Sequence, residues 1–288
     1  MTSTEACARN IILDTVISDL KHGDIEVPML PEVASKVVRL TQNPESDALE
    51  LAKLIQGDQT LAGHVMRVAN SAAYSPNASM VSLQQAITRL GMRIISEIAL
   101  AASINTSLFN TPGHEKYIQY VLNCSLAAGL WAKETARSCR KNVEAAFLAG
   151  LLNDIGRPVA VQSAIAASKK LNVPLSKGDI NEIELATKQK FSLAVLEQWE
   201  MPEAVKNVVS YFDRYDDDHE GQQQTMIVVA GTAIAQHFYC DDNESNCPDK
   251  TELLANPVFA KINLYQDEVE TLLEKKDDVN SAMEAMGL

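Results

Sequence analysis

The chain has 288 residues, of which 46% are hydrophobic and 5% aromatic, and its formal net charge is −13 at pH 7. So negative a chain repels phosphate backbones and anionic lipid headgroups, which excludes nucleic-acid or membrane binding through general electrostatics. No apolar run is long enough to cross a bilayer, and the first residues lack the pattern of a signal peptide.

The cysteine pattern bears on the compartment and on metal binding. Five cysteines form no CxxC pair: Cys7, Cys124, Cys139, Cys240 and Cys247. We interpret them as reduced thiols of a cytoplasmic protein rather than as a disulfide framework. No group of cysteines and histidines has zinc-ligand spacing, so we expect no metal and no other cofactor.

In the first part of the chain, helices are predicted over residues 8–21, from Pro31 to Asn43, and after two capping residues, Asp47 and Asp58. Beyond Ser82, apolar residues at intervals of three or four mark a further helical stripe that includes Leu90 and reaches Ile98. Gly91 lies within this stripe. It either divides two helices or allows close packing within one.

In the second part, helices are predicted over residues 113–140, 142–155, 159–171, 179–199 and 202–214. Gly156 and Pro158 are predicted to end the second of these, and Pro202 to start the last. The polar stretch 213–224 precedes further amphipathic helices, one around Ile227–Phe238 and one over 265–286. No segment alternates as a strand does, so we expect an all-α protein.

Several motifs occur in an order that resembles the HDOD domain of bacterial signal-transduction proteins, a branch of the HD superfamily. They are Asp58, Asn70-Ser71 followed by Tyr74, Leu90-Gly91, the stretch 145–159, and Trp199 with Pro202. The resemblance covers residues 27–214. It implies an HD-like bundle of two packed helical lobes, about 27–110 and 111–214. An N-terminal helix in 1–26 precedes it, and an acidic linker with C-terminal helices in 215–288 follows.

The residues of these motifs also have a structural interpretation, which we prefer to ligand contact. Asn70 and Ser71 are residue types that satisfy backbone groups at helix ends. Tyr74 can lay its ring over the same loop. Trp199, on an apolar helix face, is expected to fill the core.

The resemblance further implies a metal centre, built in catalytic HD proteins from an upstream histidine, a His-Asp pair and later histidine or acidic ligands. In this chain Cys124, Asn153 and Lys188 stand at the histidine positions, and Asp154 keeps the aspartate. One carboxylate without imidazoles holds a divalent ion poorly, and a lysine beside it opposes binding. We therefore expect a degenerate site without catalysis.

Asp154 is expected in the last turn of the helix over residues 142–155, where the helix dipole disfavours an anion by about 0.3–1 kcal/mol. A carboxylate there needs a partner. We expect Lys188, or a donor such as Asn153 or Cys124, to take the place that a metal ion has in catalytic relatives.

These observations predict a regulatory signalling module that acts through a protein partner. Three alternatives stay open: a metal-dependent phosphohydrolase with a divergent site, a sensor that binds a nucleotide without turnover, and assembly as a homo-oligomer. The helices after residue 221 could serve docking, or could simply pack on the main body.

Overall fold

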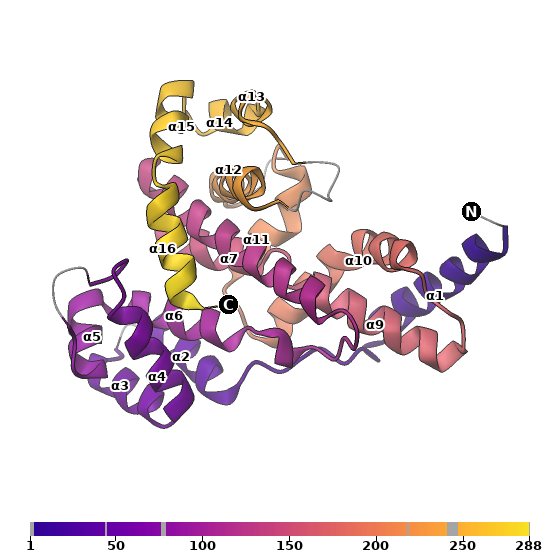
Figure 1. Cartoon of the computed structure of the whole chain (residues 1–288), viewed down its shortest axis with the longest axis horizontal. Helices are drawn as coiled ribbons and strands as arrows, with labels where there is room; N and C mark the ends of the chain where they lie inside the picture. The colour runs from indigo at the N-terminus through magenta and orange to yellow at the C-terminus, as the bar shows by residue number, and fades with distance from the viewer. Residues whose placement is uncertain (1–2, 44, 76–78, 218, 241–246, 288) are drawn as a thin grey trace.

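The computed structural model describes residues 3–43, 45–75, 79–217, 219–240 and 247–287. All regular elements in these ranges are helices, and no strand occurs in them, which confirms the predicted all-α class (Figure 1). The helices between residues 32 and 103 form one group, and those of the second half form another around a long diagonal helix, with the N-terminal helix packed on this second group.

The first group of helices follows the predicted start and stop signals closely. Its members are α2 (Glu32–Gln42), α3 (Ala48–Gln56), α4 (Gln59–Ala69), α5 (Leu83–Leu90) and α6 (Met92–Ser103). The N-terminal helix α1 (Ser3–His22) packs instead on α9 (Gly156–Leu171) and α10 (Lys177–Gln198) of the second group. Asp47 and Asp58 are caps as predicted, since their carboxylates accept hydrogen bonds from the amides of Glu50 at 2.8 Å and Leu61 at 3.0 Å. Pro31 precedes α2 as its cap, because its backbone is extended rather than helical.

The sequence left open whether Gly91 divides two helices or lies within one, and the structure shows that it divides two. Its φ is +87°, in the region that favours glycine, and it both ends α5 and precedes α6. The apolar stripe that crosses Gly91 is therefore shared by two helices.

The Asn70-Ser71 motif holds the connection that follows α4. The Asn70 side chain donates to the carbonyl of Met80 at 2.9 Å and accepts from the amide of Met80 at 2.6 Å. The carbonyl of Ser71 accepts hydrogen bonds from the amides of Tyr74 and Ser75. Tyr74 packs against the core, and burial raises the pKa of its hydroxyl. These contacts stabilise the loop itself.

The second group contains α7 (Glu115–Ser138), α8 (Val143–Leu152), α9 (Gly156–Leu171), α10 (Lys177–Gln198) and α11 (Glu203–Tyr211), with short 3-10 helices at Thr106–Leu108 and Phe212–Arg214. Pro202 caps α11. Trp199 is 5% exposed, and its indole donates to the carbonyl of Pro28 at 2.8 Å. Trp199 thus fills the core and also anchors the segment that leads into α2.

The predicted boundary between the helices around residue 155 is wrong. The first helix ends at Leu152 instead of residue 155, and the next begins at Gly156 instead of residue 159. Pro158 lies inside the first turn of α9, where no intrahelical hydrogen bond needs its missing N–H. Asn153 and Asp154 therefore lie in a tight turn between two helices.

The C-terminal helices pack on both groups. They are α12 (Gln222–Tyr239), α13 (Lys250–Leu254), α14 (Pro257–Lys261), α15 (Gln266–Leu273) and α16 (Lys276–Met286), so the predicted helix over 265–286 is interrupted near Glu274. α12 lies along α7, and α16 runs back to contact α4, α6 and α7 (Figure 1). Met286 is 1% exposed at this contact.

Glycines let the backbones of the second group touch one another. A Cβ on Gly150 of α8 would lie 2.8 Å from the carbonyl oxygen of Ala128 in α7. A Cβ on Gly231 of α12 would lie 2.3 Å from the amide nitrogen of Ala132. The closest approach is at Gly156, where a Cβ would lie 2.1 Å from the carbonyl oxygen of Lys188 in α10. No larger residue fits at these crossings without separating the helices.

We predict that Gly156→Ala lowers the free energy of unfolding by about 3 kcal/mol, because the backbones of α9 and α10 must move apart. Urea denaturation followed by circular dichroism measures the change. Gly63→Ala in α4 is the matched control, since nothing lies within 4 Å of its Cβ. It should raise stability by up to about 1 kcal/mol. Equal stability of Gly156→Ala and the parent chain would contradict the contact.

Candidate functional site

The candidate site is built around the turn between α8 and α9. Asn153 is 8% exposed, and the carboxylate of Asp154 next to it is 25% exposed. Because α9 begins at Gly156, Asp154 lies at the N-terminal end of a helix, not in a last turn as the sequence predicted. The dipole of α9 therefore favours the anion, while the dipole of α8, which ends at Leu152, opposes it.

Two cationic side chains face the Asp154 carboxylate. The Nζ of Lys188, in α10, lies 3.6 Å from its Oδ1, and a terminal nitrogen of Arg157 lies 3.7 Å from its Oδ2. The Asn153 amide also approaches Oδ1, at 3.5 Å. The positive partner expected for Asp154 is thus present twice, once from Lys188 and once from a residue that sequence reasoning did not select.

Arg157 links Asp154 to a buried polar cluster. Its Nε donates to Glu184, which is 2% exposed, and one of its terminal nitrogens donates to the Tyr117 hydroxyl at 2.8 Å. The Tyr117 hydroxyl donates to the other oxygen of Glu184 at 2.6 Å. Each oxygen of the buried Glu184 carboxylate thus has a donor, as a charge in the interior requires.

The electrostatics of this cluster keep its donors protonated. Burial alone would lower the pKa of Arg157, but the adjacent carboxylates of Asp154 and Glu184 outweigh it and hold this pKa above its ordinary value. Burial raises the pKa of Tyr117. Both side chains therefore donate hydrogen bonds at neutral pH and do not act as bases.

The sequence carried a signal for part of this cluster. Arg157 follows Asp154 by three residues, a spacing at which side chains of opposite charge can meet, and the structure pairs the two. Glu184 precedes Lys188 by four residues, but Glu184 pairs with Arg157 and Lys188 pairs with Asp154. Tyr117 had no such signal, because it comes from a different helix.

Cys124 reaches the site through a small cavity of about 60 Å³. The cavity is bounded by α7, α8, α12 and the turn, and its lining includes Cys124, Asn153, Asp154, Arg157 and Cys240. Cys124 donates from Sγ to the carbonyl of Tyr239 at 3.7 Å. Cys124, Asn153 and Asp154 thus share one cavity, while Lys188 reaches Asp154 from α10 by the ion pair described above.

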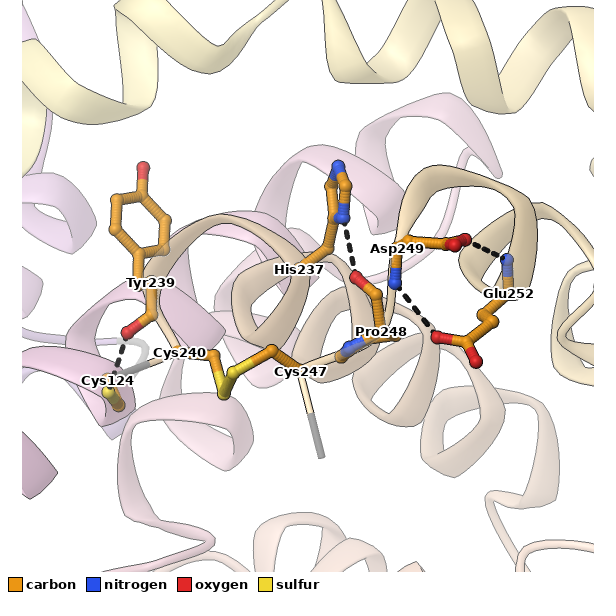
Figure 2. The surroundings of a disulfide bond; sticks show 8 residues. All are labelled: Cys124, His237, Tyr239, Cys240, Cys247, Pro248, Asp249 and Glu252. Carbon is orange, nitrogen blue, oxygen red and sulfur yellow. Dashed lines mark hydrogen bonds between the residues drawn. A yellow bond between two sulfur atoms is a disulfide. The ribbon is translucent and has the colours of Figure 1, made fainter. Parts of the chain in front are cut away.

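The prediction that all five cysteines are reduced is wrong for one pair. Cys240 and Cys247 form a disulfide with their Cα atoms 5.6 Å apart (Figure 2). His237 in α12 bonds to the carbonyl of Pro248 at 2.8 Å, which brings the start of α13 back beside the end of α12. The sequence separation of seven residues between Cys240 and Cys247 did not by itself indicate that they form a disulfide. Cys124 and Cys139 lie outside disulfides.

The donor set does not fit a metal ion. Within the described part of the chain, no three His, Cys, Asp or Glu side chains come together as ligands. Around Asp154 the neighbours are a carboxamide, an ammonium and a guanidinium. Lysine and arginine have no lone pair to offer when charged, and a neutral carboxamide is a weak replacement for an imidazole.

We predict that Glu184→Gln lowers the free energy of unfolding by about 3 kcal/mol. The largely buried, charged Arg157 then loses the ion pair with Glu184 and keeps only the one with Asp154. Glu197→Gln in the same helix is the control. Its carboxylate is 74% exposed and pairs with Lys206, so the loss should stay within about 1 kcal/mol. Urea denaturation of both variants measures the difference, and equal losses would contradict the buried network.

No helix in the described ranges combines the length and apolarity needed to cross a membrane.

Comparison with known proteins gives one family and a set of similar folds. The model of the HDOD domain matches residues 27–215. An uncharacterized protein of Treponema pallidum (strain Nichols) is 21% identical in an alignment over 242 residues that covers 80% of this chain and 47% of that protein. The chain therefore spans about half the length of this curated relative.

Two solved structures superpose on nearly the whole chain. A Shewanella amazonensis SB2B protein, described provisionally as a metal-dependent phosphohydrolase, has a TM-score of 0.76 and 21% identity, and the match covers 97% of this chain and 99% of that one. An HDOD domain protein of unknown function from Geobacter sulfurreducens has a TM-score of 0.70 and 18% identity, with 97% and 99% covered. At this identity the structures establish the fold, and the match over residues 27–215 establishes the family: the chain belongs to the HDOD family.

Proposed function

We propose that this chain is a non-catalytic signal-transduction module that binds a protein partner in the cytoplasm. The observation that carries the proposal is the pair of cations on Asp154, from Lys188 and Arg157. Membership of the HDOD family supports the signalling class. So does the fold of a Marinobacter aquaeolei VT8 protein, described provisionally as a signal transduction protein, which has a TM-score of 0.67 and 21% identity and covers 98% of this chain and 66% of that one.

Charge repulsion argues against hydrolysis assisted by a metal ion. Two unit charges about 4 Å apart near a protein surface interact by roughly 4 kcal/mol, and a divalent ion doubles this value. An ion bound at Asp154 would meet that repulsion from both Lys188 and Arg157, which lie within 4 Å of the carboxylate. Without imidazoles to compensate, Asp154 keeps its protein partners.

The size of the cavity argues against a nucleotide beside Asp154. Its volume of about 60 Å³ is several times smaller than the roughly 300–1,000 Å³ of ligand pockets. A cavity of this size holds water molecules rather than a base and its phosphates. The small volume beside Asp154 thus supports a protein partner over a nucleotide held at this turn.

We predict that the purified chain contains less than stoichiometric manganese, iron and zinc, and does not hydrolyse nucleotides or cyclic dinucleotides when these metals are added. Elemental analysis and a phosphodiesterase assay measure the two properties. The matched control is Cys124→His/Asn153→His/Lys188→His, which restores imidazoles around Asp154 and should gain affinity for zinc. Stoichiometric metal in the parent chain, with turnover that Asp154→Ala abolishes, would overturn the proposal.

The second candidate is a phosphohydrolase with a divergent site, because the Shewanella amazonensis protein of the same fold is described provisionally as one. The assay above separates it from the first. A nucleotide sensor is a third outcome, and it would show as a thermal shift with one nucleotide of a panel and no turnover.

Partner binding itself is tested by cross-linking in the native cell, followed by purification of the tagged chain and mass spectrometry. The expected result is one reproducible companion that also binds the purified chain in vitro. A second copy of the chain as that companion would identify a homo-oligomer. A chain that stays monomeric and captures nothing that rebinds in vitro would overturn the proposal of a partner.

A further inference from the structure

Three cysteines from separate elements meet at one end of the α7–α12 contact. Cys124 lies in α7, Cys240 directly follows α12, and Cys247 precedes α13. Cys240 is bonded to Cys247, and it lines the same small cavity as Cys124. In Figure 2, Cys240 lies between Cys124 and Cys247, and the Cys124 sulfur contacts the carbonyl of Tyr239, the residue before Cys240.

We propose that Cys124, Cys240 and Cys247 form a thiol–disulfide exchange site. The Cys124 thiolate attacks the Sγ of Cys240, the Cys240–Cys247 bond breaks, and a Cys124–Cys240 disulfide forms. Cys247 leaves as a thiolate and takes up the proton that Cys124 lost. One disulfide is exchanged for another, so the step needs no external oxidant or reductant.

The packing of α7 against α12 brings Cys124 to Cys240. Gly231 of α12 meets Ala132 of α7 backbone to backbone. Tyr239 follows Gly231 by eight residues and Cys124 precedes Ala132 by eight, and these two also touch. The helices thus run antiparallel in close contact over about two turns. This register places the end of α12, with Cys240, against the Cys124 side chain.

The surroundings also favour exchange at Cys124 over Cys139. Cys124 and Cys240 line one small cavity, so the two sulfur-bearing side chains are neighbours. Cys139 lies at the other end of α7, against the carbonyl of Ile262. Burial, together with Glu268, raises the pKa of Cys139, which disfavours its thiolate.

The start of α13 does not depend on the disulfide alone. His237 bonds to the carbonyl of Pro248, and Asp249 and Glu252 cap α13 reciprocally (Figure 2). Release of Cys247 can therefore leave this region folded. A disulfide in a reducing compartment is usually transient and redox-sensing, which agrees with the cytoplasmic location proposed above. The exchange rests on packing and does not require the proposed partner.

The test uses the full-length chain with Cys247→Ser, in which Cys240 has lost its partner. After mild oxidation with oxidised glutathione, tryptic digestion without reduction gives peptides that mass spectrometry distinguishes. Cleavage after Lys116 and Lys133 places Cys124 on peptide 117–133, and cleavage after Arg214 and Lys250 places Cys240 on peptide 215–250. We expect these two peptides linked by a Cys124–Cys240 disulfide.

Cys139 is the internal control, on peptide 138–140. Disulfides to Cys139 should be at least about 10-fold rarer, because adjacent thiols have an effective concentration near millimolar. In the parent chain the Cys240–Cys247 bond stays within peptide 215–250, and a trace of reduced glutathione should convert part of it to the cross-linked form.

Two results would overturn the proposal. The first is a folded Cys247→Ser chain in which Cys124 and Cys240 both still react with an alkylating reagent after oxidation. If that variant does not fold, the parent chain decides: no cross-link between peptides 117–133 and 215–250 at any ratio of glutathione forms would exclude exchange. Neither result bears on partner binding, so the two proposals fail separately.

Discussion

The architecture of the site depends on one close contact, that between the start of α9 and the backbone of α10. Gly156 has no side chain, so its Cα can approach the Lys188 carbonyl and the Ser192 amide, where a Cβ would lie within 2.3 Å of backbone atoms. The Ser192 hydroxyl donates to the carbonyl of Asn153 at 2.7 Å and accepts from the amide of Gly156 at 2.9 Å. The contact between Gly156 and α10 therefore fixes the turn that contains Asp154 and places Lys188 beside this residue.

Once these elements are joined, the charges balance within the protein. Two carboxylates, from Asp154 and Glu184, face two cations, from Lys188 and Arg157. A catalytic metal site has the opposite design, because its carboxylates and imidazoles leave positive charge to be supplied by the ion. In this chain the side chains of Lys188 and Arg157 supply the positive charge. The arrangement therefore needs no bound ion to balance its charges.

Sequence reasoning succeeded where a local pattern controls the structure. The caps Asp47 and Asp58 lie where their spacing to the following apolar residues placed them. It was wrong at Pro158, because a proline that stops one helix is equally at home in the first turn of the next. That error changed the electrostatic interpretation of Asp154, which lies between the unfavourable end of the α8 dipole and the favourable end of the α9 dipole.

The sequence by itself determined the all-α class and most helices, through periodicity and caps, and its resemblance to HD proteins predicted that Cys124, Asn153 and Lys188 stand at histidine positions. Only the tertiary structure decided what surrounds them. Tyr117 and Glu184 are 67 residues apart, and Cys124 and Tyr239 are 115 apart. Contacts of this kind depend on how whole helices pack, through glycines and buried surfaces, and a local pattern carries no record of which helix faces which.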